Sequence, residues 1–152
     1  MIVSDSTTLI ILFDTKKIDL LGNLFEKIYI PRAVLKEINR KKTVNLPDYF
    51  EVCEVEPFEE LKLILDDGES EAITLAVNKK LPLIIDEKKG RKIAKNYNVK
   101  IIGLIGILIL NVQKGYLNKN EALSFLEYIN DRGFRVSEKL KENFKKALKG
   151  LG

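Results

Sequence analysis

The chain has 152 residues, of which 45% are hydrophobic and 32% are charged, and its net charge is +4. This balance is typical of one globular domain and excludes a disordered chain. The absence of histidine excludes the Ser-His-Asp triad, histidine acid–base catalysis and the usual zinc sites, and the single cysteine excludes an internal disulfide.

Short apolar strands alternate with helices along the chain. The first half predicts, in order, strand 2–3, helices 9–12 and 18–25, strand 28–30, helix 31–42, strand 50–55 and helix 61–65. Pro31 suits the first position of its helix, and Cys53 is expected to be a small buried side chain in a short or edge strand. The run Asp66-Asp67-Gly68 is expected to end the last of these helices.

The second half continues the alternation and then becomes helical. It predicts helix 69–79, strand 83–85, helix 90–96, strand 99–102 and helices 104–113, 119–130 and 138–148, with breaks at Gly115 and Gly133. Such alternation indicates an α/β fold with three layers, α/β/α, around a central, mainly parallel twisted sheet. We expect a single domain over residues 1–152, with a helical C-terminal part over residues 104–152.

Acidic residues stand where acids are unusual. Asp5 and Asp86 follow predicted strands, and the carboxyl ends of parallel strands form the ligand-binding edge of a sheet. Glu37 falls inside the apolar arc of its helix, Glu69 falls inside the arc of the next long helix, and Glu71 lies at the rim of that arc. Because converging carboxylates repel one another, they indicate a hard cation, Mg²⁺ or Mn²⁺, and therefore phosphate chemistry.

Each acidic position also has an ordinary explanation. Asp5 and Asp86 could each cap the helix that follows. Glu69 and Glu71 open a helix, where negative charge suits the helix dipole. The stem of Glu37 could pack while its carboxylate reaches water. The joint occurrence of two acids at strand ends and two on inward helix faces favours a common site.

Charge is unevenly distributed. Residues 48–71 contain ten acidic residues against one lysine, and residues 132–152 contain seven basic residues against two acidic ones. A further basic cluster follows Asp86 and comprises Lys88, Lys89, Arg91, Lys92 and Lys95. Such clusters could hold a polyanion beside an acidic centre, or could be solvated helix faces. The apolar run at 101–110 is too short to span a membrane, and no secretory leader is apparent.

Several short motifs, in this order, resemble the PIN-domain superfamily, which includes the VapC-type toxins. They are the strand ending at Asp5-Ser6, the segment 30–34 leading to Glu37, Gly68-Glu69-Ser70-Glu71-Ala72-Ile73 and Ile84-Ile85-Asp86-Glu87. With the Asp-Glu-x-x-Gly-Arg motif at 86–91 and the segments 103–106 and 133–137, they are most similar to an uncharacterised prokaryotic PIN-like family of about this length. The resemblance spans nearly the whole chain.

The resemblance implies a nuclease, mostly of RNA, that uses Mg²⁺ or Mn²⁺. Asp5, Glu37, Asp86 and one of Glu69 and Glu71 would supply its carboxylates. The superfamily usually has an aspartate at the third position, where this chain offers two glutamates: the motif favours Glu71 and helix periodicity favours Glu69. A water molecule activated by the metal would hydrolyse the phosphodiester bond.

Other residues receive supporting roles in this hypothesis. Ser6 or Thr7 could hydrogen-bond a carboxylate or a metal-bound water, and Lys88, Lys89 and Arg91 could hold phosphates. We expect a cytoplasmic homodimer, with a small antitoxin partner if the protein is a toxin; the many lysine, glutamate and isoleucine residues hint at a thermophile. The last helix, with Leu140, Phe144, Ala147 and Leu148 on one side, could cover the core, form the dimer or receive the antitoxin.

Two alternatives compete with the nuclease hypothesis. One is a phosphoacceptor receiver domain, which would need paired acids after the first strand and a lysine that ends a late strand. The chain has one acid after its first strand, and Lys100 begins its strand. The other alternative is a PIN-like module that binds RNA or a protein with little or no cleavage.

Overall fold

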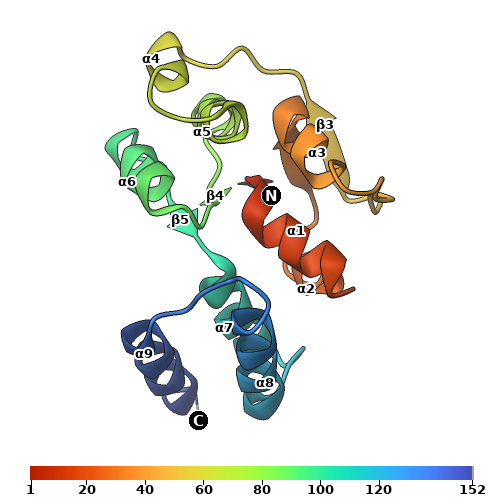
Figure 1. Ribbon diagram of the computed structural model, residues 1–152, viewed down its shortest axis with the longest axis vertical. Coiled ribbons are helices and arrows are strands. Elements are labelled where there is room, and N and C mark those ends of the chain that lie inside the picture. Colours follow the sequence, from red (N-terminus) through yellow and green to blue (C-terminus); the bar gives the residue numbers. More distant parts are fainter. Residues whose placement is uncertain (152) are drawn as a thin grey trace. The chain divides into compact units, whose positions relative to one another are not determined.

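The computed structural model of the chain describes residues 1–151. Backbone contacts divide the chain into two compact units, Met1–Leu104 and Ile105–Gly152 (Figure 1). Within residues 1–151, the five strands and six of the helices lie in the first unit, and the elements described in the second unit are helices. The prediction of a single domain over residues 1–152 stays a prediction.

The first unit is built on a sheet of five parallel strands. They are β1 (Ile2–Ser4), β2 (Ile28–Pro31), β3 (Phe50–Cys53), β4 (Leu83–Ile84) and β5 (Ile101–Ile102), in the spatial order β3-β2-β1-β4-β5. All four neighbouring pairs are parallel. Val3, Ile28, Ile30 and Leu83 are completely buried, because a parallel sheet has both faces covered.

Helices connect the strands and cover the sheet. They are α1 (Ser6–Asp14), α2 (Asp19–Gly22), α3 (Arg32–Ile38), α4 (Glu59–Lys62), α5 (Asp67–Lys79) and α6 (Lys88–Asn96). The chain runs from β1 to β3 in one direction and then crosses to β4 and β5 in the other. Right-handed crossovers therefore place α1 and α3 on one face and α5 and α6 on the other, as Figure 1 shows. The predicted three-layer α/β/α fold with a parallel sheet is confirmed.

Several predicted boundaries are wrong: the helix expected over 18–25 covers only Asp19–Gly22, and the strand expected over 99–102 covers only Ile101–Ile102. The helix expected to reach residue 42 ends at Ile38, because Asn39 leaves helical geometry and its Oδ1 accepts the N–H of Val44 at 2.9 Å. Pro31 ends β2 with extended backbone and precedes the helix, so Arg32 is the first helical residue. The strand at 50–55 stops at Cys53, whose side chain is half-buried; its position at the sheet edge is as expected.

The run Asp66-Asp67-Gly68 also behaves differently from the prediction. It does not end a helix, because α4 ends earlier, at Lys62, and α5 starts at Asp67. The side chain of Asp66 accepts the backbone N–H of Glu69 at 2.8 Å, which is the usual bond of an N-cap residue. The run therefore begins the helix that carries two of the candidate glutamates.

The second unit consists of three helices with an apolar interior. α7 (Leu104–Gln113) begins at the last residue of the first unit, and α8 (Lys119–Asn130) and α9 (Glu138–Lys149) follow. Asn118 and Glu121 form a capping box at the start of α8, and Ser137 caps α9. The bounds of α7 and α8 agree with the predicted ranges. On α9, Phe144 and Leu148 are buried, whereas Leu140 is 42% exposed.

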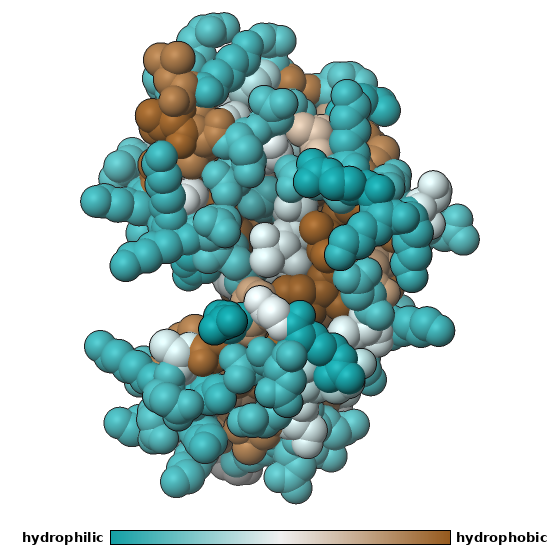
Figure 2. All heavy atoms as spheres, in the orientation of Figure 1, coloured by the Kyte–Doolittle hydropathy of each residue, from teal (hydrophilic) through white to brown (hydrophobic). Residues whose placement is uncertain are grey.

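The surface is mostly polar (Figure 2). Apolar atoms gather where α4 lies in Figure 1, and Leu63 and Ile64, directly after α4, are 86% and 46% exposed. Within residues 1–151, no helix combines the length and hydrophobicity needed to cross a bilayer.

Candidate functional site

Asp5 lies at the carboxyl end of the central strand. β1 pairs with β2 on one side and with β4 on the other, so Asp5 stands where the sheet changes its winding direction, the usual ligand site of such folds. Its backbone N–H bonds to the Ile84 carbonyl at 2.9 Å, and the residue is only 3% exposed. The position is the N-cap of α1, but the side chain makes no capping bond. Capping therefore does not explain this aspartate.

One oxygen of this buried carboxylate has no partner. Asp5 Oδ1 is inaccessible to solvent and accepts no hydrogen bond from any group in residues 1–151. Leaving a buried carboxylate oxygen unpaired is costly, so natural proteins keep such groups mainly where a ligand or ion pairs with them. This orphaned oxygen is the clearest sign of a binding site in the molecule.

The carboxylate of Glu37, on α3, lies close to that of Asp5, and both lie beside Gly68 in the first turn of α5. Ser6 Oγ donates to Glu37 Oε2 at 2.8 Å, which fixes the carboxylate beside β1. A Cβ built at Gly68 would overlap Glu37 Oε1 and would lie 3.6 Å from Asp5 Oδ1. A side chain at residue 68 would therefore displace the Glu37 carboxylate from its present position, whereas Asp5 Oδ1 would remain at an ordinary contact distance.

Glu69 also points toward this centre. It is only 9% exposed, although it lies in the first turn of a helix. Its Cδ is 3.8 Å from the position that a Cβ would take at Gly90, in the first turn of α6. The glutamate therefore lies between the starts of two helices, where their dipoles favour negative charge.

The pKa values show that these carboxylates act on one another. The pKa of Asp5 is raised to about 8, mainly by burial. A hydrogen bond from the Ser6 backbone lowers this pKa, and the charges of Glu37, Glu69 and Asp66 raise it. Burial also raises the pKa of Glu69 to about 7, helped by the charges of Asp66, Glu87 and Glu37. The pKa of Glu37 is raised by burial and lowered by the bond from Ser6. Four residues form this acidic cluster: Asp5, Glu37, Asp66 and Glu69.

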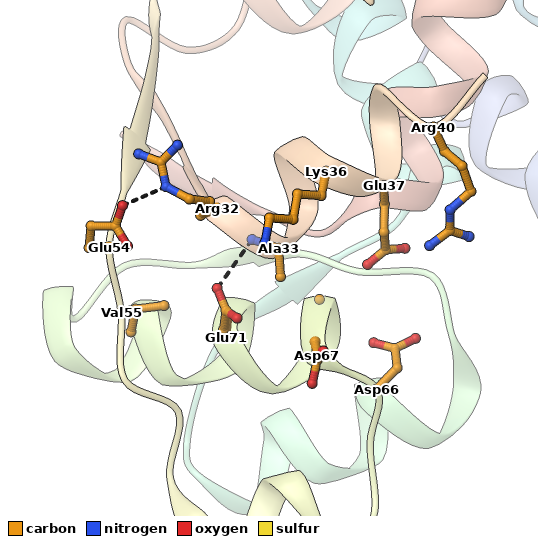
Figure 3. Close-up of a pocket in the computed structure, with 11 residues that line it drawn as sticks. Arg32, Ala33, Lys36, Glu37, Arg40, Glu54, Val55, Asp66, Asp67 and Glu71 are labelled. Atoms are coloured by element: carbon orange, nitrogen blue, oxygen red, sulfur yellow. Dashed lines mark hydrogen bonds and ion pairs between the residues drawn. The ribbon is translucent and has the colours of Figure 1, made fainter. Parts of the chain in front are cut away.

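Glu71 lies on the other side of α5 from these contacts. Its Oε1 accepts the backbone N–H of Ala33 at 3.2 Å (Figure 3). This N–H is one of the first in α3, which have no partner within the helix. Burial raises the pKa of Glu71, and the bond from Ala33 lowers it. In this arrangement Glu71 connects two helices, whereas Glu69 belongs to the acidic cluster.

Asp86 follows β4 and is held by two donors. The Thr8 hydroxyl donates to Oδ2, and the backbone N–H of Leu104 donates to Oδ1 at 3.0 Å. The N-cap of α6 is Glu87, so Asp86 does not cap the helix that follows it. A Cβ at Gly103 would lie 2.8 Å from Asp86 Oδ1, so the glycine leaves room for this carboxylate.

The supporting residues divide into those in contact with the acids and those on the surface. Ser6 bonds to Glu37, and the hydroxyl that bonds to Asp86 belongs to Thr8 rather than to Thr7. Arg91 Nη1 donates to the Ile85 carbonyl at 2.6 Å, so this guanidinium stabilises the turn after β4. Lys88 and Lys89 are exposed at the start of α6, and the charge of Lys89 lowers the pKa of Glu69.

The chemistry of the cluster suits a hard divalent cation. It offers carboxylate oxygens, the ligands that Mg²⁺ and Mn²⁺ prefer, and Asp5 Oδ1 is an oxygen with no other partner in the described chain. As the side chains of residues 1–151 stand, no three acidic or cysteine groups are arranged closely enough to hold a metal ion. Binding would therefore require the carboxylates of the cluster to come closer together.

A pocket of about 610 Å³ adjoins the cluster on the side of α3. Arg32, Lys36 and Arg40 contribute one wall, on and just after α3, and Asp66, Asp67 and Glu71 contribute the other, at the start of α5 (Figure 3). Glu37 lines the pocket and also belongs to the acidic cluster.

Sequence reasoning missed Asp66, Thr8 and this pocket. The prediction of a helix stop at Asp66 overlooked that an Asp three residues before Glu69 is also an N-cap signal. The spacing of 32, 36 and 40 by four residues could have shown a basic helix face. No sequence signal revealed that this face lies opposite the acids of α5, since the two are separated by more than 25 residues.

One comparison with known proteins gives a match. A sequence model described as a PIN domain matches residues 1–150, which is nearly the whole chain and includes both units. No curated protein and no solved structure matches it.

Proposed function

Because the chain belongs to the PIN-domain family, a nuclease-type fold that implies a nucleic-acid substrate, we propose that it is a metal-dependent endoribonuclease. The observation that carries the proposal is the buried, unpartnered Oδ1 of Asp5 at the carboxyl end of β1. The charges of Glu37, Glu69 and Asp66 all act on this carboxylate. A cation is the partner that such a group lacks.

Asp5, Glu37 and Glu69 of the acidic cluster would hold the metal, Mg²⁺ or Mn²⁺. Asp86 is not one of the cluster residues and is held by Thr8 and Leu104, and it would be a further ligand on the ground of the family motif. Glu71 stays a candidate from the family motif, although its bond to Ala33 favours Glu69. When bound, such a cation supplies Lewis-acid chemistry: it favours the hydroxide form of water and stabilises negative charge on phosphoryl oxygens. PIN domains generally depend on divalent metals.

The chain's own residues would orient the reacting groups. Ser6 holds the Glu37 carboxylate by its hydroxyl, and Thr8 holds that of Asp86. Such bonds fix the direction of a ligand oxygen. Lys88 and Lys89, exposed after Asp86, would hold phosphates of the substrate. Arg91 would act indirectly, since its guanidinium is engaged by the Ile85 carbonyl beside Asp86.

Cleavage of single-stranded RNA tests the proposal. The wild-type protein with Mg²⁺ or Mn²⁺ should cut the RNA, and EDTA or Asp5→Asn should abolish the cut. Asp48→Asn is the matched control, because Asp48 is exposed in the loop before β3 and loses the same charge. Cleavage that survives both EDTA and Asp5→Asn would contradict the proposed site.

The second candidate is a PIN-like module that binds RNA or a protein without cutting it. It is favoured by the lack, within residues 1–151, of three acids arranged closely enough to hold a metal ion. Calorimetric titration with Mn²⁺, combined with the cleavage assay, separates the two. Metal and RNA binding without turnover would support the module and contradict the nuclease.

The biological setting is part of the proposal. We place the protein in the cytoplasm, in agreement with its single free cysteine, and its lysine- and glutamate-rich composition favours a thermophilic source. A VapC-type toxin would form a homodimer and bind a small antitoxin. Co-expression with a neighbouring gene for a short DNA-binding protein tests this: relief of growth arrest supports a toxin, and growth unaffected by the protein alone contradicts it.

A further inference from the structure

The pocket between α3 and α5 has one basic and one acidic wall, and no ion pair within residues 1–151 joins them. The charges still act on each other at longer range, because Arg40 lowers the pKa of Glu37 and Lys36 lowers that of Glu71. Arg32 is already paired with Glu54, at 2.5 Å between Nε and Oε1. Lys36 and Arg40 line the same wall, are exposed and form no ion pair within residues 1–151. Two cations therefore remain available at the pocket to bind an anion from outside.

The opposite wall offers hydrogen-bond acceptors. Asp67 lies in the first turn of α5 and is exposed, and its carboxylate accepts no hydrogen bond from the rest of the described chain. Glu71 has one oxygen engaged by Ala33. A simple anion such as free phosphate would be repelled by this wall, so the pocket suits a ligand with phosphate on one side and hydroxyl donors on the other.

A ribonucleotide has this distribution of groups. Its phosphate would lie against Lys36 and Arg40, and its ribose 2′-hydroxyl would donate to a carboxylate of α5. The volume of about 610 Å³ is in the range of small-molecule sites. A deoxyribonucleotide lacks the 2′-hydroxyl and would leave the acidic wall unpaired.

We propose that this pocket binds one nucleotide of a single-stranded RNA beside the cleavage site, with its phosphate on Lys36 and Arg40 and its ribose on Asp67. Glu37 connects this pocket to the acidic cluster, because it lines the pocket and acts on Asp5. The inference rests on the proposed function in one respect: the RNA strand is expected to run from this pocket to the acidic cluster because the cluster is the proposed cleavage site. It adds a set of binding residues on the side of the cluster away from Lys88 and Lys89, and a reason to prefer RNA over DNA.

Binding in EDTA tests the pocket without requiring cleavage. The fluorescence anisotropy of a labelled single-stranded RNA is measured with wild type, Lys36→Ala/Arg40→Ala and the control Lys41→Ala/Lys42→Ala. The control removes the same charge from exposed residues that do not line the pocket. The pocket variant should bind about tenfold more weakly than the control. Its slope of log affinity against log salt should be shallower by about 0.7 for each phosphate that the variant no longer neutralises.

The ribose contact is tested by comparing RNA with DNA of the same sequence. Asp67→Ala should reduce the preference for RNA toward equal binding, whereas Asp48→Ala, which removes the same charge from the exposed loop before β3, should leave the ratio unchanged. The ratio is the measure because removing any carboxylate raises the affinity for both polyanions. An unchanged ratio in Asp67→Ala would overturn the ribose assignment.

The outcomes separate this inference from the nuclease proposal. Equal RNA affinity and salt slope for the pocket variant and its control overturn the inference, whether or not the wild type cuts RNA. Weaker binding by the pocket variant alone supports the inference, even if no metal brings about cleavage. Wild-type protein that binds neither RNA nor DNA overturns the inference.

Discussion

The two units of the chain bury different kinds of side chain. The sheet unit, residues 1–104, buries polar or charged residues near the carboxyl ends of its strands and along the first two-thirds of α5: Ser4, Asp5, Ser6, Thr8, Glu69, Ser70 and Thr74. Among the described residues of the helical unit, Asn111 alone is a buried polar side chain. Folding stability favours apolar interiors, so the costly groups of the first unit indicate where the function lies.

The first prediction compares two glutamates of the same helix and has the largest expected effect. Glu69→Gln should reduce cleavage and Mn²⁺ affinity by more than about a hundredfold, because it removes a carboxylate of the acidic cluster. Glu71→Gln keeps an acceptor for the Ala33 N–H and should reduce cleavage and Mn²⁺ affinity by less than about tenfold. Calorimetry and single-turnover cleavage measure both. The reverse order would assign the metal to Glu71, as the family motif suggests.

The second prediction changes the glycine against which Glu37 lies. Gly68→Ala should push the Glu37 carboxylate away from Asp5 and lower cleavage by about tenfold or more, since the new Cβ would overlap Glu37 Oε1. Gly150→Ala in the helical unit is the control. Its Cβ would meet ordinary contacts of 3.5 Å, and cleavage should not change. Full activity of Gly68→Ala would mean that the position of Glu37 is not critical.

The third prediction tests the helical unit. Phe144→Leu on α9 should lower the free energy of unfolding by about 1–2 kcal/mol, because Phe144 is 1% exposed and the smaller side chain leaves a void. Mn²⁺ affinity should be unchanged. Urea denaturation and calorimetry measure the two quantities. If the free energy of Mn²⁺ binding weakened by as much as the free energy of unfolding, the helical unit would also contribute to the metal site.

The fourth prediction concerns the pH dependence of stability. Asp5 and Glu69 have pKa values of about 8 and about 7 in the folded protein, above the ordinary values of 3.8 and 4.5. Between these values the folded state holds more protons than the unfolded state, so stability falls as the pH rises from about 4 to about 8. In EDTA, Tm should decrease over this interval by about 2–4 °C for each kcal/mol of stability removed.

The control for the pH dependence is Asp5→Asn, which cannot ionise at this position and should have a flatter Tm profile. Mn²⁺ binds the deprotonated carboxylates, so it should raise Tm most at high pH and oppose the decrease. Differential scanning fluorimetry from pH 4 to pH 9 gives both curves. Identical profiles for wild type and Asp5→Asn would show that Asp5 is not the group that titrates.

Much of the fold could be predicted from the sequence. Short runs such as Leu83-Ile84-Ile85 between helical segments required a parallel sheet, and apolar periodicity together with capping residues gave the bounds of α7 and α8. The boundaries that failed depended on contacts outside the local pattern. Asn39 ends α3 by a bond to Val44, and Pro31 is held in β2 beside Cys53.

For the candidate site, the sequence by itself determined which side chains reach the edge of the sheet. Asp5 and Asp86 follow strands, and the helical period turned Glu37 and Glu69 inward, because strand polarity and the 3.6-residue repeat are local properties. Only the tertiary structure decided which acids meet. It brought Asp66 to Asp5, turned Glu71 toward Ala33 and set the basic face of α3 opposite α5. Such choices depend on how distant segments pack, and no local pattern encodes that packing.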